Sequence, residues 1–274
     1  LFMHILFVHK NFPAQFGHIA HWLIHHEGFR CTFISEKDPG SIGSIECLQY
    51  KIRGTATERT HFCSRSFENF TWHSHAVYET LKARPDIRPD LVVGHSGFGS
   101  TVFLPDLYDC PIINFCEWFY EPRKPHEEFR CELPAHPLAP QRSDLRNAMF
   151  FLALHTCSAA YSPTWFQRSQ LPPEYHYKVE TLFDGVDTTL WRPQPWLRSG
   201  PRQIAGRDIP RGTRIVTYVS RGFEAMRGFD VFMQAAKLVC DRRSDVLFVC
   251  VGSDQEAYGN YPGLTGGESY REFV

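Results

Sequence analysis

The sequence lacks the features that mark several specialised classes of protein. It has 274 residues and a formal net charge of −1, so positive and negative side chains almost balance. Without a basic excess there is no electrostatic reason to expect binding to nucleic acid or to an anionic membrane. No apolar run reaches the roughly 20 residues that cross a bilayer. The first apolar run, residues 4–8, is short and follows no basic segment, which favours a buried strand over a signal peptide.

The cysteines and histidines lack the spacing of a metal site. There are nine cysteines, an odd number, and none forms a Cys-x-x-Cys pair, so neither a zinc cage nor a disulfide framework is expected. Reduced thiols and a cytoplasmic location fit this pattern better. His18, His21 and His25 share one face of an expected helix, but no carboxylate or cysteine completes a ligand set. No metal site is therefore expected.

Short apolar runs alternate with helical patterns along most of the chain. This alternation predicts an α/β fold with a mainly parallel sheet that helices cover on both faces. Strands are predicted at residues 4–9, 30–35, 91–93, 112–116, 158–161, 178–183, 214–219 and 245–251. Helices are predicted at residues 15–27, 143–155, 163–169 and 229–240. Ser162 is expected to cap the third of these helices.

The segment 191–212 differs from the sequence on either side of it. It is rich in proline and arginine and poor in apolar residues, which is typical of a linker between domains. We therefore expect an N-terminal Rossmann-like domain over residues 1–190, a linker over 191–212 and a partial second Rossmann-like domain over 213–274. The last region holds a single strand–helix–strand unit, which buries little surface, so we expect it to be the less stable of the two.

The segment 213–230 combines an apolar strand, a glycine-flanked loop and the start of a helix. Two arginines, Arg221 and Arg227, lie in that loop. In open α/β sheets ligands bind at the carboxyl ends of the strands. Guanidinium groups beside a helix N-terminus suit a diphosphate. The alternative is that both arginines are ordinary solvated loop charges.

Four segments, taken in order along the chain, resemble those of a known family. They are MHILFVHKNFPAQF at residues 3–16, PDLVVGHSGFG at 89–99, FDGVD with WRP within 183–193, and VSR with RGF within 219–229. The chain thereby resembles a bacterial family-4 (group 1) glycosyltransferase that is truncated at its C-terminus. That family has the GT-B fold, in which two Rossmann-like domains face each other across a cleft.

The resemblance implies a retaining glycosyltransferase. Such an enzyme moves a sugar from a nucleotide diphosphate sugar to a glycan, lipid-linked or small-molecule acceptor, as in polysaccharide biosynthesis, and it needs no metal cofactor. Arg221 and Arg227 would stabilise the negative charge that builds on the leaving diphosphate. A lipid-linked acceptor would add peripheral contact with the inner face of the membrane.

The resemblance also implies a set of residues around the cleft. Gln15, His95 and Gly97 fall in loops that would contact substrate, although a loop-stabilising role for His95 is an equal alternative. Many relatives place a histidine after the strand at residues 112–116, where this chain has Glu117. As the catalytic candidate, Glu117 would hydrogen-bond a sugar hydroxyl or help to deprotonate the acceptor. The alternative for Glu117 is a structural carboxylate bound by nearby backbone amides.

One family feature has no counterpart in this sequence. The paired glutamates of the family, eight positions apart, are not found before Val274, and Glu268 lies too close to Gly252 to be one of them. Two other functions therefore stay open. The chain could be a non-catalytic truncated fragment that only binds a ligand or partner. It could also be a nucleotide-sugar epimerase, because a fold does not fix a function.

Overall fold

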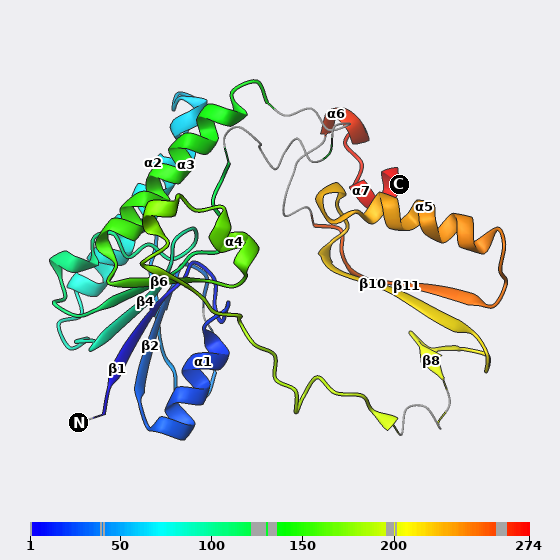
Figure 1. Cartoon of the computed structure of the whole chain (residues 1–274), viewed down its shortest axis with the longest axis horizontal. Coiled ribbons are helices and arrows are strands. Elements are labelled where there is room, and N and C mark those ends of the chain that lie inside the picture. Colours follow the sequence, from blue (N-terminus) through cyan, green and yellow to red (C-terminus); the bar gives the residue numbers. More distant parts are fainter. Residues whose placement is uncertain are drawn as a thin grey trace. The chain divides into compact units, whose positions relative to one another are not determined.

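The computed structural model describes residues 2–38, 40, 42–121, 130, 136–195, 200, 202–255 and 262–274 (Figure 1). The chain divides into two compact units, residues 1–185 and residues 186–274. The sequence predicts a domain boundary after residue 190, whereas the division in the structure follows Gly185.

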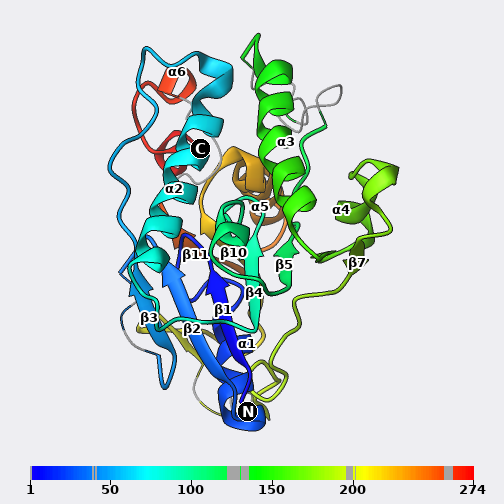
Figure 2. The same cartoon turned by 90° about the vertical axis from the view of Figure 1, so that its left-hand side faces the viewer.

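The first unit is built on a seven-stranded sheet in which all neighbouring strands are parallel. The strands lie in the order β3-β2-β1-β4-β5-β6-β7 (Figures 1 and 2). In chain order they are β1 (His4–Val8), β2 (Arg30–Ser35), β3 (Glu46–Gln49), β4 (Leu91–His95), β5 (Ile112–Phe115), β6 (Ala159–Ser162) and β7 (Val179–Thr181). This sheet confirms the parallel α/β fold that the alternation of apolar runs and helical patterns predicts.

Helices cover both faces of this sheet, because alternate side chains of each strand point in opposite directions. On one face, Ile5 and Phe7 of β1 belong to the same core cluster as Ala20 of α1. On the other face, Leu6 and Val8 share a core cluster with buried side chains of α2 and α3, which lie side by side in Figure 2. The α-helices of the unit are α1 (Gly17–Trp22), continued by the π-helical turn Leu23–Glu27, α2 (Arg65–Lys82), α3 (Ala139–Thr156) and α4 (Trp165–Ser169).

Several elements differ from the prediction. β3 and α2 were not predicted, and α3 begins at Ala139, several residues before the predicted start. The predicted cap of α4 was wrong: Thr164 caps the helix, and its Oγ1 accepts a hydrogen bond of 3.2 Å from the Gln167 N–H. Ser162 instead ends β6, and its hydroxyl donates to the Cys116 carbonyl. Proline at position 163 lies between the strand and the helix, and the helix starts two residues later than predicted.

A buried asparagine joins the sheet to a helix and to a loop. Asn114 lies in β5 and is fully buried. Its Nδ2 donates to the Ala153 carbonyl of α3 at 3.0 Å, and its Oδ1 accepts from the Thr101 hydroxyl at 3.1 Å. Both ends of the amide are therefore satisfied, as a buried polar group requires. The bonds fix α3 and the loop after β4 relative to the sheet.

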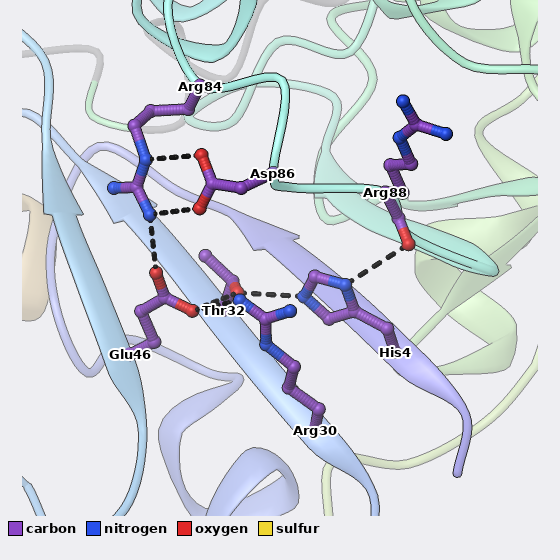
Figure 3. Close-up of polar contacts among 7 residues, drawn as sticks. All are labelled: His4, Arg30, Thr32, Glu46, Arg84, Asp86 and Arg88. Carbon is purple, nitrogen blue, oxygen red and sulfur yellow. Dashed lines mark hydrogen bonds and ion pairs between the residues drawn. The ribbon is translucent and has the colours of Figure 1, made fainter. Parts of the chain in front are cut away.

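The amino ends of the strands carry a network of ion pairs and hydrogen bonds (Figure 3). Glu46 accepts from Arg30 at 2.7 Å and from Arg84 at 2.9 Å. Arg84 also makes two bonds to Asp86. Buried His4 donates through Nδ1 to the carbonyl of Arg88. Since these charges compensate one another, the network has a structural role at this edge of the sheet.

The second unit contains much less sheet. β10 (Arg214–Gly222) and β11 (Val246–Ser253) form a parallel pair, and α5 (Phe229–Cys240) connects them, in the predicted order of elements. Helices α6 (Pro262–Thr265) and α7 (Tyr270–Phe273) follow. Within the described part of the chain, neither β10 nor β11 pairs with a third strand.

A short hairpin lies inside the segment that the sequence analysis interprets as a linker. β8 (Gln203–Ile204) and β9 (Arg207–Asp208) are antiparallel. Ala205 and Gly206 turn the chain between them with φ of 49° and 76°. The segment 191–212 is therefore partly structured, and its role as a linker stays a prediction.

Candidate functional site

A pocket of about 290 Å³ opens in the first unit. Lys10, His95 and Glu117 line it, and each lies at or just after the end of a strand, namely β1, β4 and β5. Side chains of α2 and α3 form its helical wall, and every lining residue belongs to residues 1–185. The strand order reverses between β1 and β4. Open α/β sheets bind ligands beside such a switch point, at the carboxyl ends of the strands.

The hydrogen bonds of His95 define its tautomer. Its Nδ1 accepts from the backbone N–H groups of Gly97 at 3.0 Å and Phe98 at 3.2 Å. In the neutral ring the proton is therefore on Nε2, which lies 3.2 Å from Oε2 of Glu117. The His95 side chain is only 2% exposed. The histidine thus acts as a fixed, buried donor to the carboxylate.

Glu117 combines a fixed orientation with access to the pocket. It follows β5 directly after Cys116, and its side chain is 37% exposed and lines the pocket. The bond from His95 holds one oxygen of the carboxylate. The structure therefore brings together two residues that the sequence analysis selected separately. The ring of His95 also stabilises the loop, because the same ring accepts hydrogen bonds from the loop backbone and contacts the carboxylate of Glu117.

The two other residues predicted at the cleft have different places. Gly97 lines the pocket and supports His95 through its N–H. Gln15 is half-buried and is not among the residues that line this pocket, so its contact with substrate stays a prediction. The sequence analysis did not single out Gly99. A Cβ atom there would lie 1.9 Å from the carbonyl oxygen of Val8, so only glycine allows β1 and this loop to approach so closely.

A second histidine next to the pair was also missed. His9 follows β1, is 3% exposed, and its ring centroid lies 5.2 Å from that of His95. Burial and the neighbouring His95 lower the pKa of His9 to about 4, so the ring is neutral at pH 7. Burial and the charge of Glu117 raise the pKa of Asp184. Asp184 precedes Gly185, whose φ is 80°.

The helical wall of the pocket carries a guanidinium group. Arg146 of α3 lies with its Cζ 4.8 Å from the centre of the Tyr120 ring. Its Nε donates to the Ser66 hydroxyl of α2 at 3.4 Å. His73 of α2 lines the same wall, and its Nδ1 lies 3.0 Å from the hydroxyl of buried Tyr50. None of these residues belongs to a motif, so no pattern in the sequence marked them.

The two arginines predicted to bind a diphosphate lie in the second unit. Arg221 is an exposed residue of β10, and its carbonyl accepts from the Ser253 hydroxyl. Arg227 precedes Gly228 and the N-terminus of α5. Its Nε pairs at 2.9 Å with Oε1 of Glu224, a fully buried carboxylate that the sequence analysis did not consider. This pair offsets one positive charge of the loop, and the binding of a diphosphate by the two arginines stays a prediction.

The described residues include no group of three or more histidine, cysteine, aspartate or glutamate side chains arranged to hold a metal ion. All cysteines that the structure describes are free thiols, and Cys131 lies outside the described residues. No helix among the described ranges has the length and apolar character needed to span a bilayer.

Comparison with known proteins identifies similar sequences and folds. The model of the glycosyl transferase family 4 group matches residues 27–191, more than half of the chain. No curated protein matches the sequence. The crystal structure of the kitacinnamycin glycotransferase is similar over 94% of this chain and 68% of its own, at 15% identity and a TM-score of 0.51. Anabaena Alr3699/HepE, solved in complex with UDP and glucose, is similar over 92% of this chain and 61% of its own, at 13% identity and a TM-score of 0.55.

An epimerase also occurs among the similar structures. UDP-N-acetylglucosamine 2-epimerase from Rickettsia bellii matches 91% of this chain and 62% of its own, at 9% identity and a TM-score of 0.44. A score at that level carries no argument about function. The likeness to the two glycosyltransferase structures concerns the fold, and it confirms the GT-B type of architecture. This chain spans 68% and 61% of their lengths.

Proposed function

The chain belongs to the glycosyl transferase family 4 group, and from this premise we propose that it moves a sugar from a nucleotide diphosphate sugar to a hydroxyl group of an acceptor. The family and the fold support a transferase. The nucleotide-sugar donor is supported by the fold shared with Anabaena Alr3699/HepE, which was solved with UDP and glucose. We propose a glycan, lipid-linked or small-molecule acceptor. A lipid-linked acceptor would bring the cytoplasmic protein to the inner face of the membrane for polysaccharide biosynthesis.

The observation that carries the proposal is the Glu117 carboxylate, held by His95 at the mouth of a pocket where the strand order reverses. A general base must reach the proton that it removes. A carboxylate oriented by a buried donor keeps one direction toward the pocket. His95 Nε2 lies 3.2 Å from one oxygen of this carboxylate, which leaves the other oxygen as the candidate proton acceptor.

The oxygen of the acceptor hydroxyl forms a bond to the anomeric carbon, and the bond from that carbon to the diphosphate oxygen breaks. The electron pair of the broken bond stays on the departing nucleoside diphosphate. The hydroxyl proton passes to Glu117. We propose that the configuration at the anomeric carbon is retained, as the family resemblance implies.

We propose that positive side chains, without a metal cofactor, stabilise the departing diphosphate. Arg221 and Arg227 are the candidates. Glu224 pairs with Arg227 and offsets part of its positive charge. The ion pair also fixes the orientation of the Arg227 guanidinium, which stays a candidate hydrogen-bond donor to the diphosphate.

The test is a transfer assay with a panel of nucleotide sugars and acceptors, in which release of nucleoside diphosphate is measured. We expect the wild-type chain to release it, and Glu117→Gln to lower the rate by roughly 10²- to 10⁴-fold, the range typical of a lost general base. Glu180→Gln is the matched control, because Glu180 is exposed on β7 and is not among the residues that line the pocket.

Other outcomes of these assays would support one of the alternative functions. Binding of nucleoside diphosphate in calorimetry without transfer by any donor would indicate a non-catalytic protein. A change in the donor sugar without an acceptor would indicate an epimerase. Full activity of Glu117→Gln alongside an active wild type would reduce Glu117 to a structural carboxylate.

A further inference from the structure

Among the described residues, one positive charge of the pocket lining has no ion-pair partner. Among the described residues, no carboxylate forms an ion pair with Arg146, whose contacts are the Tyr120 ring and the Ser66 hydroxyl. Lys10, the other permanently charged cation of the lining, already pairs with Glu36 at 3.4 Å. A half-buried guanidinium whose partners are an aromatic ring and a hydroxyl is well suited to an anion, to which it can make two parallel hydrogen bonds.

The position of this guanidinium is fixed by the residue that follows it. Asn147 is 3% exposed. Its Oδ1 accepts from the backbone N–H of Tyr120 at 3.0 Å, and its Nδ2 donates to the carbonyl of the same residue. These two bonds lock the backbone of Tyr120 to α3. The ring of Tyr120 therefore stays against Arg146, and the guanidinium is held by stacking before any ligand arrives.

The pocket carries charges of opposite sign on its strand side and on its helical wall. Glu117 lies at the strand side and carries a negative charge, whereas Arg146 lies on the helical wall. An anionic group is repelled by Glu117 and attracted by Arg146. The apolar side chains of Phe70, Trp118 and Met149 line the remaining surface, where a sugar ring or an apolar group can pack. The volume of about 290 Å³ suits a small molecule or one end of a larger one.

We propose that the acceptor carries a carboxylate or phosphate group, which Arg146 binds while the reacting hydroxyl lies at Glu117. The inference rests on the proposed transfer to a hydroxyl group and names the chemical class of its acceptor. Arg146 determines specificity, because it distinguishes an acidic acceptor from a neutral one with the same hydroxyl groups. Tyr120 and Asn147 act as positioning residues for Arg146.

The first experiment measures binding without any donor. Glucuronic acid, glucose 6-phosphate and glucose are titrated into the wild-type chain, Arg146→Gln, Arg146→Lys and Arg88→Gln. Arg88 is the matched control, since it is an exposed arginine at the amino edge of the same sheet, and only its backbone carbonyl contacts His4 (Figure 3).

We expect at least one acidic probe to bind the wild type about tenfold or more tightly than glucose, as charged hydrogen bonds do. Arg146→Gln is expected to lose this preference, Arg146→Lys to keep part of it, and Arg88→Gln to keep all of it. A preference for glucuronic acid assigns a carboxylate, and one for glucose 6-phosphate assigns a phosphate. Equal binding of glucose and both acids by the wild type, absence of binding by both acids, or an unchanged preference in Arg146→Gln would overturn the inference.

The second experiment separates this inference from the proposed function. The transfer assay is repeated with acidic and neutral acceptors. Transfer to neutral acceptors alone overturns the inference and leaves the transferase in place. Preferential binding of an acid that depends on Arg146, with no transfer from any donor, refutes the transferase and leaves an anion-binding pocket.

Discussion

The strands β1 and β10 have similar apolar sequences and very different surroundings. All five residues of β1 are buried, whereas β10 exposes most of its residues, including Val219 at 74%. β1 lies between two parallel neighbours and under helices on both faces. β10 pairs only with β11 among the described residues. The comparison shows that an apolar strand pattern predicts a strand, while its burial depends on partners elsewhere in the chain.

The largest expected difference between the two units is in hydrogen exchange. Amides of β1 should exchange only through global unfolding, which costs roughly 5–15 kcal/mol for a typical domain. Amides of β10 should open with a free energy several kcal/mol lower, because one side of the strand has no ladder in the described structure. Exchange followed by mass spectrometry or NMR checks this expectation. Equal protection of the two strands would remove the contrast.

Substitution of one leucine in a helix of each unit tests the same contrast in burial. Leu154 of α3 is fully buried, and Leu154→Ala should lower the free energy of unfolding by about 2–5 kcal/mol, because it leaves a cavity. Leu238 of α5 is 57% exposed, and Leu238→Ala should change it by no more than about 0.5 kcal/mol. Urea unfolding monitored by circular dichroism measures both. If Leu238→Ala lowered the free energy of unfolding as much as Leu154→Ala does, α5 would be covered in solution.

The part of the pH dependence of stability that comes from histidines should belong to the first unit. All 14 histidines precede residue 186. The pKa of His9 is lowered to about 4, chiefly by burial, from the 6.5 of an exposed ring. Between these values the unfolded chain binds the proton and the folded chain does not. Stability is therefore complete above about pH 6.5 and is lost as the pH falls toward 4, by up to about 3 kcal/mol.

Burial also lowers the pKa values of His4 and His73, which adds to the loss in the same direction. The contribution of His9 is isolated by urea unfolding of His9→Gln between pH 7 and pH 4, where the slope against pH should decrease. His75→Gln is the control, since His75 is an exposed side chain of α2. An unchanged slope in His9→Gln would assign the pH dependence to other groups.

Much of the fold follows from local patterns in the sequence. The parallel sheet was predictable because its strands are short, apolar and separated by helical segments. α5 was predicted with its observed bounds, since Gly228 precedes it and its apolar period is regular. α2 was missed although its buried residues Ser74, Val77 and Leu81 recur at helical spacing, so this part of the fold could have been predicted.

The candidate site was predictable in part, for a related reason. His95, Gly97 and Glu117 follow strands, and strand ends in parallel sheets meet at one edge. The bond between His95 and Glu117 requires β4 beside β5, an order that the sequence does not reveal. Arg146 meets Tyr120 only through tertiary packing. The Glu224–Arg227 pair spans three positions, so that contact could have been anticipated from sequence.

The two hydrogen bonds of Asn114 have a consequence for the kinetics of binding. They tie α3, which carries one wall of the pocket, and the loop around Thr101 to the same strand. A ligand therefore meets walls that are already in place, and little conformational entropy is lost when it enters. Association should be fast and nearly insensitive to small changes in the pocket. Differences in affinity among variants should then arise in how long each ligand resides there.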